Sequence, residues 1–243
     1  MKFVHLATRN LKEIFRDPVS VLLGLAMPLA MLLLFATIEK RAPIEIFSAQ
    51  HLTPGIIIFS FTFLIMFAAM LLAKDKEGAF LTRLFTTPLK ASDYIVSYML
   101  PFLPLALLQI TVCMVAGTLL GASFTNIALS LLPLLLIAFA CINLGVMLGA
   151  LFTVNQISGI GSLLITAIGL FSNVWMDIKM VGGIFETIGY ALPFAHSVDA
   201  AKGLLMGKPL FYYSTDITIV LAYALVLFGL AVIAFRKILD KRY

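Results

Sequence analysis

Charged residues are scarce in this sequence. Asp, Glu, Lys and Arg make up 12% of its 243 residues, whereas soluble domains carry about 25%. From Tyr94 to Trp175 there is no Asp, Glu, Lys, Arg or His at all. Hydrophobic residues reach 62% and the mean hydropathy is +1.08, which excludes an ordinary water-soluble core. We therefore expect the bilayer to be the solvent for most of the chain.

The residue patterns of catalysis and of metal binding are missing as well. A phosphate-binding loop reads G-x-x-x-x-G-K-[ST], but in the nearest stretch, GLLMGKPL, Gly203 is one residue too close and Pro209 replaces the hydroxyl residue. The three histidines are isolated and lack metal-ligand spacing. Cys113 and Cys141 both lie in apolar blocks, which does not support a disulfide framework. The sequence thus predicts no enzyme activity by itself, no metal site and no directly bound cofactor.

Ionisable residues avoid the interior of the apolar blocks. Ion-coupled carriers usually hold such residues inside their spans, whereas all twelve Asp and Glu residues here fall in loops, termini or span edges. This distribution disfavours an ion-coupled carrier, which we keep as the weakest alternative.

Six stretches are long and apolar enough to cross a bilayer, which needs roughly 20 residues. They cover residues 19–38, 54–73, 95–120, 127–152, 158–176 and 217–235. The third contains PFLP, residues 101–104, where missing backbone donors should break or offset the helix. The sequence therefore predicts an all-α integral membrane protein with six transmembrane helices.

The positive charges give the orientation. With both termini on one side, that side holds twelve of the 17 Lys and Arg residues and the other side holds five. Excess positive charge marks the cytoplasmic side, so both termini are expected in the cytoplasm of a multi-pass protein of the cell membrane. Anionic lipid headgroups account for the formal net charge of +5. The bases are too scattered for a nucleic-acid groove, so no nucleic-acid partner is expected.

Residues 1–18 predict an amphipathic helix that lies along the inner leaflet. Apolar residues recur on one face at helical spacing, and basic residues fall on the opposite face. We assign to this interface helix Phe3, Arg9, Leu11, Lys12 and Arg16. The alternative is a solvated leader before the first span.

A second helix that does not span is expected in the charged loop 74–94, KDKEGAFLTRLFTTPLKASDY. Phe80, Leu81, Leu84 and Phe85 share one face at the helical period of 3.6 residues, and Pro88 stops the helix. This apolar face could lie against the membrane surface. The sharper interpretation is that it docks on a partner protein.

Residues 177–216 are too polar for a full span and too apolar for a plain loop. Pro193 divides them into two short helices, each less than a membrane thick, which is typical of a re-entrant or interfacial helical hairpin. The polar elements of this outer hairpin would be Glu186, His196, Asp199 and Lys202.

Polar and small residues inside the spans allow two interpretations. Gln109, Asn143 and Asn173 could line a substrate path, or they could form hydrogen bonds between helices. The pairs Gly117 with Gly121 and Gly145 with Gly149 have the small-xxx-small spacing that favours close helix packing.

Two motifs resemble those of a known family. In the loop 74–94, an acid-base-acid triplet is followed in register by a second set of matching residues, which together are Asp75, Lys76, Glu77, Leu81, Arg83, Leu84, Thr87 and Pro88. Three positions depart from the family pattern: Ala79, Phe80 and Thr82. In LPFAHSVDAAKGLLMG, residues 192–207, Pro193, Asp199 and Ala200 keep the places of a second signature, and Lys202 stands where Arg is frequent. The whole chain, residues 1–243, resembles a single membrane domain of the ABC-2 type (type V) ABC transporters.

This resemblance implies the permease subunit of an exporter that moves an amphiphilic compound, such as a drug, antibiotic, lipid or peptide, outward. A separate ATP-binding cassette subunit would bind ATP and magnesium. A second membrane subunit, expected to be an identical copy, would complete a pump in a prokaryotic cell membrane. Contact with the ATPase would fall to Asp75, Lys76, Glu77, Phe80, Leu81, Arg83, Leu84, Phe85, Thr87 and Pro88, with Arg83 and Glu77 pairing at its rim. The alternative from a different class is a non-transport scaffold or sensor that uses the same ATPase contact.

Overall fold

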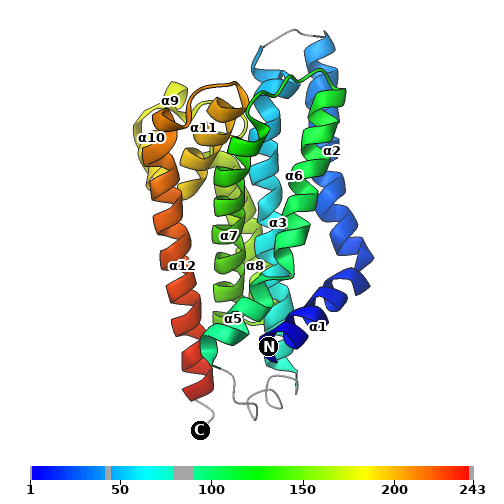
Figure 1. Cartoon of the computed structure of the whole chain (residues 1–243), viewed down its shortest axis with the longest axis vertical. Coiled ribbons are helices and arrows are strands. Elements are labelled where there is room, and N and C mark those ends of the chain that lie inside the picture. The colour runs from blue at the N-terminus through cyan, green and yellow to red at the C-terminus, as the bar shows by residue number, and fades with distance from the viewer. Residues whose placement is uncertain (1, 42–44, 79–89, 241–243) are drawn as a thin grey trace.

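A computed structural model describes residues 2–41, 45–78 and 90–240. Within these ranges the chain is helical and has no strand, and Figure 1 shows a bundle of long helices. Six segments are long and apolar enough to cross a membrane: Pro18–Arg41, Ala49–Glu77, Ala91–Leu119, Ile127–Leu151, Val154–Phe171 and Leu210–Lys237. Both termini lie at one end of the bundle (Figure 1), called here the terminal end. The predicted all-α membrane protein with six spans is confirmed.

Two helices form the centre of the bundle, α3 (Ala49–Glu77) and α7 (Ile127–Leu151). Of the most apolar window of α3, 72% is buried inside the chain, against 17% for α8 (Val154–Phe171). A Cβ at Gly149 would lie 2.5 Å from the carbonyl oxygen of Ala69, and one at Gly145 would clash with that of Ile65. The pair of small residues therefore lets the backbones of α7 and α3 approach closely, as its spacing predicts.

The other glycine pair divides its roles. A Cβ at Gly117 would lie 2.5 Å from Thr53 Oγ1, so Gly117 packs against α3. Gly121 has a φ of 100° and follows the end of its helix, with open space around it. Gly121 therefore serves the turn, because this backbone conformation favours glycine.

The third span is broken, as the prolines predict. It consists of α5 (Ala91–Met99), inclined across the terminal end, and α6 (Phe102–Leu119), which crosses the bundle (Figure 1). Pro101 has no N–H to donate to the Ser97 carbonyl four residues earlier. The side chain of Asn10 supplies the missing donor, since Asn10 Nδ2 lies 3.1 Å from Ser97 O. This amide joins α1 (Lys2–Arg16) to the break in the third span.

A second proline is compensated in the same way. Pro28 lies inside α2 (Pro18–Arg41) and leaves the Gly24 carbonyl without its helical donor. Gln109 Nε2, from α6, lies 3.1 Å from Gly24 O and 3.3 Å from Ser60 O of α3. Gln109 is fully buried, so it fastens three helices together within the membrane.

The three residues considered for a substrate path are all buried between helices of one chain. Besides Gln109, Asn143 Nδ2 donates to Ala224 O at 3.4 Å, and Asn173 bonds to the outer helices as described below. These contacts fit the alternative of hydrogen bonding between helices. Gln109 Oε1 and Asn143 Oδ1 have no bonding partner within the described part of the chain, and their place on a path stays a prediction.

The bounds of the fifth span differ from the predicted 158–176. Thr153 Oγ1 accepts from the Gln156 N–H at 3.4 Å, and Gln156 Oε1 accepts from the Thr153 N–H at 3.0 Å. This capping box starts α8 at Val154. The helix ends at Phe171, before Asn173, whose φ of 58° turns the chain. Hydropathy alone did not locate the capping box that starts α8 or the turn at Asn173 that follows its end.

The outer segment forms short helices at the end opposite the termini (Figure 1): α9 (Ile178–Val181), α10 (Gly183–Ala191) and α11 (Pro193–Leu205). The predicted break at Pro193 is where α11 begins. Almost all of α11 is buried, and it packs against α7, α3 and the last helix, α12 (Ser214–Asp240), whereas α10 is largely exposed. Two 3-10 turns, Glu45–Phe47 and Leu210–Tyr213, complete the connections.

Candidate functional site

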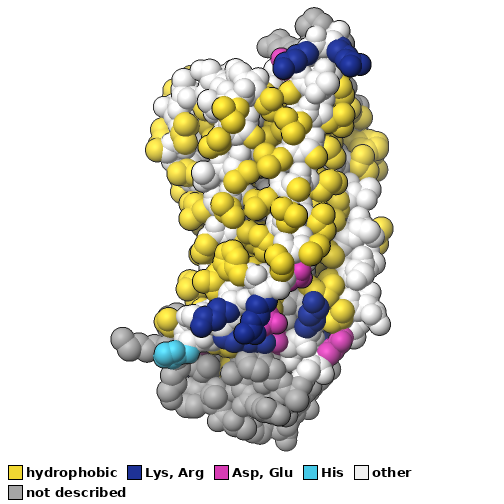
Figure 2. Space-filling model, turned by 90° about the vertical axis from the view of Figure 1, so that its right-hand side faces the viewer, with side chains coloured by type: hydrophobic (Ala, Val, Ile, Leu, Met, Phe, Trp, Pro, Cys, Tyr) yellow, Lys and Arg dark blue, Asp and Glu magenta, His cyan; other side chains and the backbone are white. Residues whose placement is uncertain are grey.

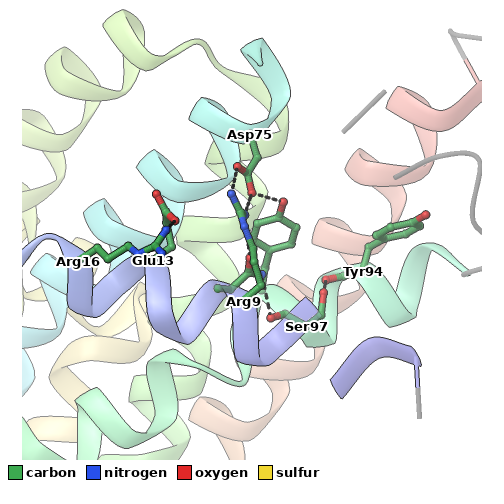
Figure 3. A network of polar contacts seen from close by, with 8 residues as sticks. Arg9, Glu13, Arg16, Asp75, Tyr94 and Ser97 are labelled. Atoms are coloured by element: carbon green, nitrogen blue, oxygen red, sulfur yellow. Dashed lines mark hydrogen bonds and ion pairs between the residues drawn. The ribbon is translucent and has the colours of Figure 1, made fainter. Parts of the chain in front are cut away.

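The chemistry of the terminal end gathers where α3 stops, at the acid-base-acid triplet. Asp75 is only 7% exposed and receives two hydrogen bonds from Arg9 of α1, with Nη1–Oδ2 at 2.5 Å and Nη2–Oδ1 at 3.0 Å (Figure 3). Tyr98 of α5 donates its hydroxyl to the same Oδ2 at 2.6 Å. Burial alone would lower the pKa of Arg9, but its hydrogen bond and ion pair with Asp75 hold that pKa above the usual value. Asp75 therefore ties α3 to both α1 and α5.

Lys76 and Glu77 attach the same helix end to two other helices. Lys76 Nζ donates to the carbonyl oxygens of Ala150, at 3.0 Å, and Phe152, at 2.6 Å, which close the C-terminus of α7. Glu77 Oε1 accepts from the N–H of Val154 at 2.9 Å, the first residue of α8. Each charge complements the helix dipole that it faces, a cation at a C-terminus and an anion at an N-terminus.

The triplet reaches all these neighbours because successive residues of a helix point about 100° apart. Asp75 faces α1 and α5, Lys76 faces α7, and Glu77 faces α8. We call these three residues and their partners the α3 clamp. The α3 clamp therefore joins the end of α3 to four other helices, α1, α5, α7 and α8.

The residues predicted to contact the ATPase fall into two groups, one within α3 and one after its end. Asp75, Lys76 and Glu77 bond to other helices of the same chain. Glu77, expected at the rim of a partner, is exposed and has one carboxylate oxygen bonded to α8. The others lie outside the described residues, namely Phe80, Leu81, Arg83, Leu84, Phe85, Thr87 and Pro88. Their contact with an ATPase stays a prediction.

The interface helix packs as an amphipathic helix. Ala7 and Ile14 are buried, Leu11 is half-buried, and Lys12 and Arg16 are exposed. Arg16 lies 3.7 Å from Glu13, which is a loose pair. The side chain of Phe3 lies outside the described residues.

Sequence reasoning missed Tyr98 in the α3 clamp, and it missed the neighbouring bond between Asn10 and Ser97. Their only sequence signal was polarity beside apolar blocks, since helical period predicts a face but not which distant residue will meet it.

The outer hairpin holds a second polar cluster. Asn173, in its left-handed turn, donates through Nδ2 to Asp199 Oδ1 at 2.9 Å and to the Tyr190 hydroxyl at 3.0 Å. The Tyr190 hydroxyl donates to Asp199 Oδ2 at 2.5 Å, and burial together with that carboxylate raises the pKa of Tyr190. Lys202 Nζ donates to Asn173 O at 2.9 Å, and burial lowers the pKa of Lys202. These contacts join Asp199 and Lys202 of the second signature to the end of α8.

His196 fastens the same hairpin to the last span. Its Nδ1 lies 2.6 Å from Asp216 Oδ1 and its Nε2 lies 3.0 Å from Tyr190 O. Both partners are acceptors, so both ring nitrogens must donate, which requires the imidazolium form. The hydrogen bond to Asp216 accordingly raises the pKa of His196. Glu186 is half-buried on α10.

Across the described ranges, no three His, Cys, Asp or Glu side chains gather in a way that could hold a metal ion. The polar groups of both clusters are used instead to join helices. Both clusters therefore hold neighbouring helices together.

Comparison with known proteins supplies the family. Residues 1–206 match the ABC-2 type transporter family. The chain is similar to the protein named "Putative transport permease ycf38" of Pyropia yezoensis, with 31% identity over 127 residues that cover 50% of this chain and 44% of the relative. The protein of the same name from Porphyra purpurea is 29% identical over 124 residues, covering 49% and 43%. The matches thus span less than half the length of these relatives. On the match to residues 1–206, the chain belongs to the ABC-2 type transporter family.

Proposed function

We propose that this permease subunit works in an exporter that moves an amphiphilic compound outward with ATP hydrolysed by a separate subunit. The observation that carries the proposal is the α3 clamp, which ends directly before residues 79–89. A partner that binds those residues and changes conformation would move α3. The α3 clamp would pass that movement to α1, α5, α7 and α8. Rigid movement of packed helices between two arrangements is a common way to switch a protein.

The partner would be an ATP-binding cassette subunit that carries ATP and magnesium. Phe80, Leu81, Leu84 and Phe85 would enter a cleft of this subunit, with Arg83 at its rim. Both termini and the α3 clamp would face the cytoplasm, on the side that the excess of Lys and Arg predicts. The membrane would be the cell membrane of a prokaryote.

A second copy of the chain would complete the permease, and the exposed face of α8 supports this. Asn155, Ser158, Ser162 and Thr166 recur along it at helical spacing and are exposed. The hydroxyls of the last three bond to carbonyl oxygens of their own helix. Small residues let a second helix approach closely in a membrane, whereas a face in contact with lipid alone gains nothing from them.

The direct test is reconstitution of the chain with its ATPase in vesicles. Lys76→Met should leave ATP hydrolysis in place but lower cargo movement per ATP by about tenfold, because the end of α3 then loses its hydrogen bonds to the C-terminus of α7. Lys208→Met, which removes an exposed charge at the opposite end, is the matched control. Unchanged transport by Lys76→Met would remove the clamp from the mechanism.

Contact with the ATPase is tested separately. Arg83→Glu combined with Phe85→Ala should abolish co-purification of the ATPase or its stimulation by cargo, while membrane insertion persists. Normal co-purification together with cargo-stimulated hydrolysis in this variant would refute the coupling assignment. Hydrolysis and pairing without any cargo movement would instead favour a non-transport scaffold or sensor.

A further inference from the structure

A cleft of about 340 Å³ opens between α1, the start of α2 and the last turns of α3. Its lining includes the charged residues Glu13, Asp17 and Lys74, called here its mouth, and the apolar residues Met66, Phe67 and Met70, called its floor. The α3 clamp lies beside it, since Asp75 contributes to the lining. This volume is within the range of small-ligand sites, about 300–1,000 Å³.

The cleft runs from headgroup depth into the apolar part of the bilayer. Asp17 stands directly before the first span, and Lys74 lies near the end of the second. Met66 precedes Lys74 by eight positions on the same helix, which places it about 12 Å deeper. On the face shown in Figure 2, charged side chains likewise gather in a band near the terminal end, below a broad hydrophobic zone.

The floor is apolar and adaptable. Phe67 packs over Gly24 of α2, where an added Cβ would lie 3.0 Å from the ring. Met66 reaches α8 at Gly161, where no Cβ would fit beside its sulfur. All three floor residues are half-buried, so each offers part of its surface to an occupant. Methionine is flexible and polarizable, which suits a surface that receives an alkyl chain.

The mouth offers charges of both signs. Asp75 is occupied by Arg9 and Tyr98, whereas Glu13 forms a loose 3.7 Å pair with Arg16. Asp17 caps α2 by accepting from Ser20 Oγ at 2.7 Å and from Ser20 N at 3.2 Å. Those hydrogen bonds, with a smaller contribution from the charge of Lys74, lower the pKa of Asp17 and keep it ionised. Two carboxylates and one ammonium therefore surround an apolar floor.

We propose that this cleft binds a zwitterionic phospholipid of the adjacent leaflet, with its amine between Glu13 and Asp17, its phosphate at Lys74, and an acyl chain along Met66, Phe67 and Met70. An anionic headgroup without an amine would meet two carboxylates. A purely cationic amphiphile would meet Lys74. The site stands apart from the proposed export, because a lipid can occupy it whether or not the lipid is carried.

The test is native mass spectrometry of the purified full chain titrated with single lipids. Phosphatidylethanolamine should bind at least about tenfold more tightly than phosphatidylglycerol or dodecylammonium. Glu13→Gln with Asp17→Asn should lower the affinity for phosphatidylethanolamine by about tenfold. Asn keeps the helix cap that Asp17 provides, so this variant should stay folded. Lys74→Met should lower the same affinity and remove the disadvantage of dodecylammonium.

Three results would overturn the site. The first is equal binding of phosphatidylglycerol and phosphatidylethanolamine. The second is an equal loss in Glu186→Gln, which removes a half-buried carboxylate at the opposite end. The third is dodecylammonium binding as tightly as phosphatidylethanolamine with no effect of Lys74→Met, which would mean that only a cation is recognised.

Discussion

Single side chains replace backbone donors that proline removes from this bundle. Asn10 donates to the Ser97 carbonyl freed by Pro101, and Gln109 donates to the Gly24 carbonyl freed by Pro28. A buried polar group left unpaired costs about 1–3 kcal/mol. Each amide therefore stabilises a break that would otherwise weaken its helix, and it also fixes which neighbour that helix meets.

Asn10→Leu should lower the free energy of unfolding by about 1–2 kcal/mol, because the Ser97 carbonyl loses its donor. In a Pro101→Ala background, residue 101 regains an N–H, so the same substitution should cost less. Denaturation of the four proteins in one detergent measures both costs. Equal costs in the two backgrounds would show that Asn10 acts through other contacts, such as the hydrogen bond that it accepts from Arg9.

His196 makes the outer hairpin sensitive to pH. Its pKa is raised from the usual 6.5 by Asp216, so its contribution to stability is complete below that value and is lost as pH rises through the higher folded value. Asp216 and the Tyr190 carbonyl contact the ring, and Asp199 lies near enough to act on it. We expect the amides of α11 to exchange hydrogen faster as pH rises, after correction for intrinsic rates.

His196→Gln is the control for this pH dependence, because glutamine cannot titrate. If its α11 amides showed the same dependence as the parent chain, another group would be the titrating one and the assignment to His196 would be wrong.

At the scale of helices, close approach depends on glycine at a few positions. Gly145 and Gly149 place α7 directly against the carbonyl oxygens of α3. Gly159 of α8 has open space around it. Within the chain, glycine is therefore required for packing in α7. At position 159 of α8 no described neighbour requires it, and there it lowers helix propensity.

Gly145→Ala should destabilise the chain by about 1–3 kcal/mol, since the new methyl group forces α7 away from Ile65. Gly159→Ala should be neutral or stabilise by up to about 1 kcal/mol. Thermal unfolding of both variants checks the difference. Similar behaviour of the two would mean that α3 and α7 can separate without loss.

Many of the helices could be predicted from the sequence, but some of their ends and contacts could not. Long apolar blocks predicted the six spans, and PFLP predicted the break after α5, because length and missing donors are local properties. The start of α8 depended on the capping box of Thr153 and Gln156, a local signal that hydropathy averages away. The bond between Arg9 and Asp75 joins residues 66 positions apart, and local period carries no information about such a distant partner.

At the scale of the whole molecule, the peripheral helices remain incompletely covered. Only 17% of the apolar window of α8 and 22% of that of α2 are buried inside the chain. Lipid covers such faces well, but α8 carries Ser158, Ser162 and Thr166 on the exposed side. This contrast between apolar and small polar faces is the basis for placing a second copy at α8.

Ser162→Cys should therefore form a disulfide-linked dimer in membranes under mild oxidation. Leu225→Cys, which is 60% exposed on α12, should stay monomeric on a denaturing gel. Cys113 and Cys141 are buried and should not contribute. Cross-linking of both variants to the same extent would point to random collision, and no cross-linking of Ser162→Cys would place the second copy elsewhere.

The bonds that hold α1 to later helices can form only after those helices have been synthesised. The helix that carries Arg9 and Asn10 emerges before its partners, since Asp75 follows Arg9 by 66 positions and Ser97 follows Asn10 by 87. At about 5–20 residues per second, the ribosome supplies these partners roughly 3–17 s later. Until then α1 lacks these partners, and its amphipathic face can lie at the membrane surface beside the first span, α2. During synthesis α1 is thus a peripheral segment of the membrane before it becomes part of the bundle.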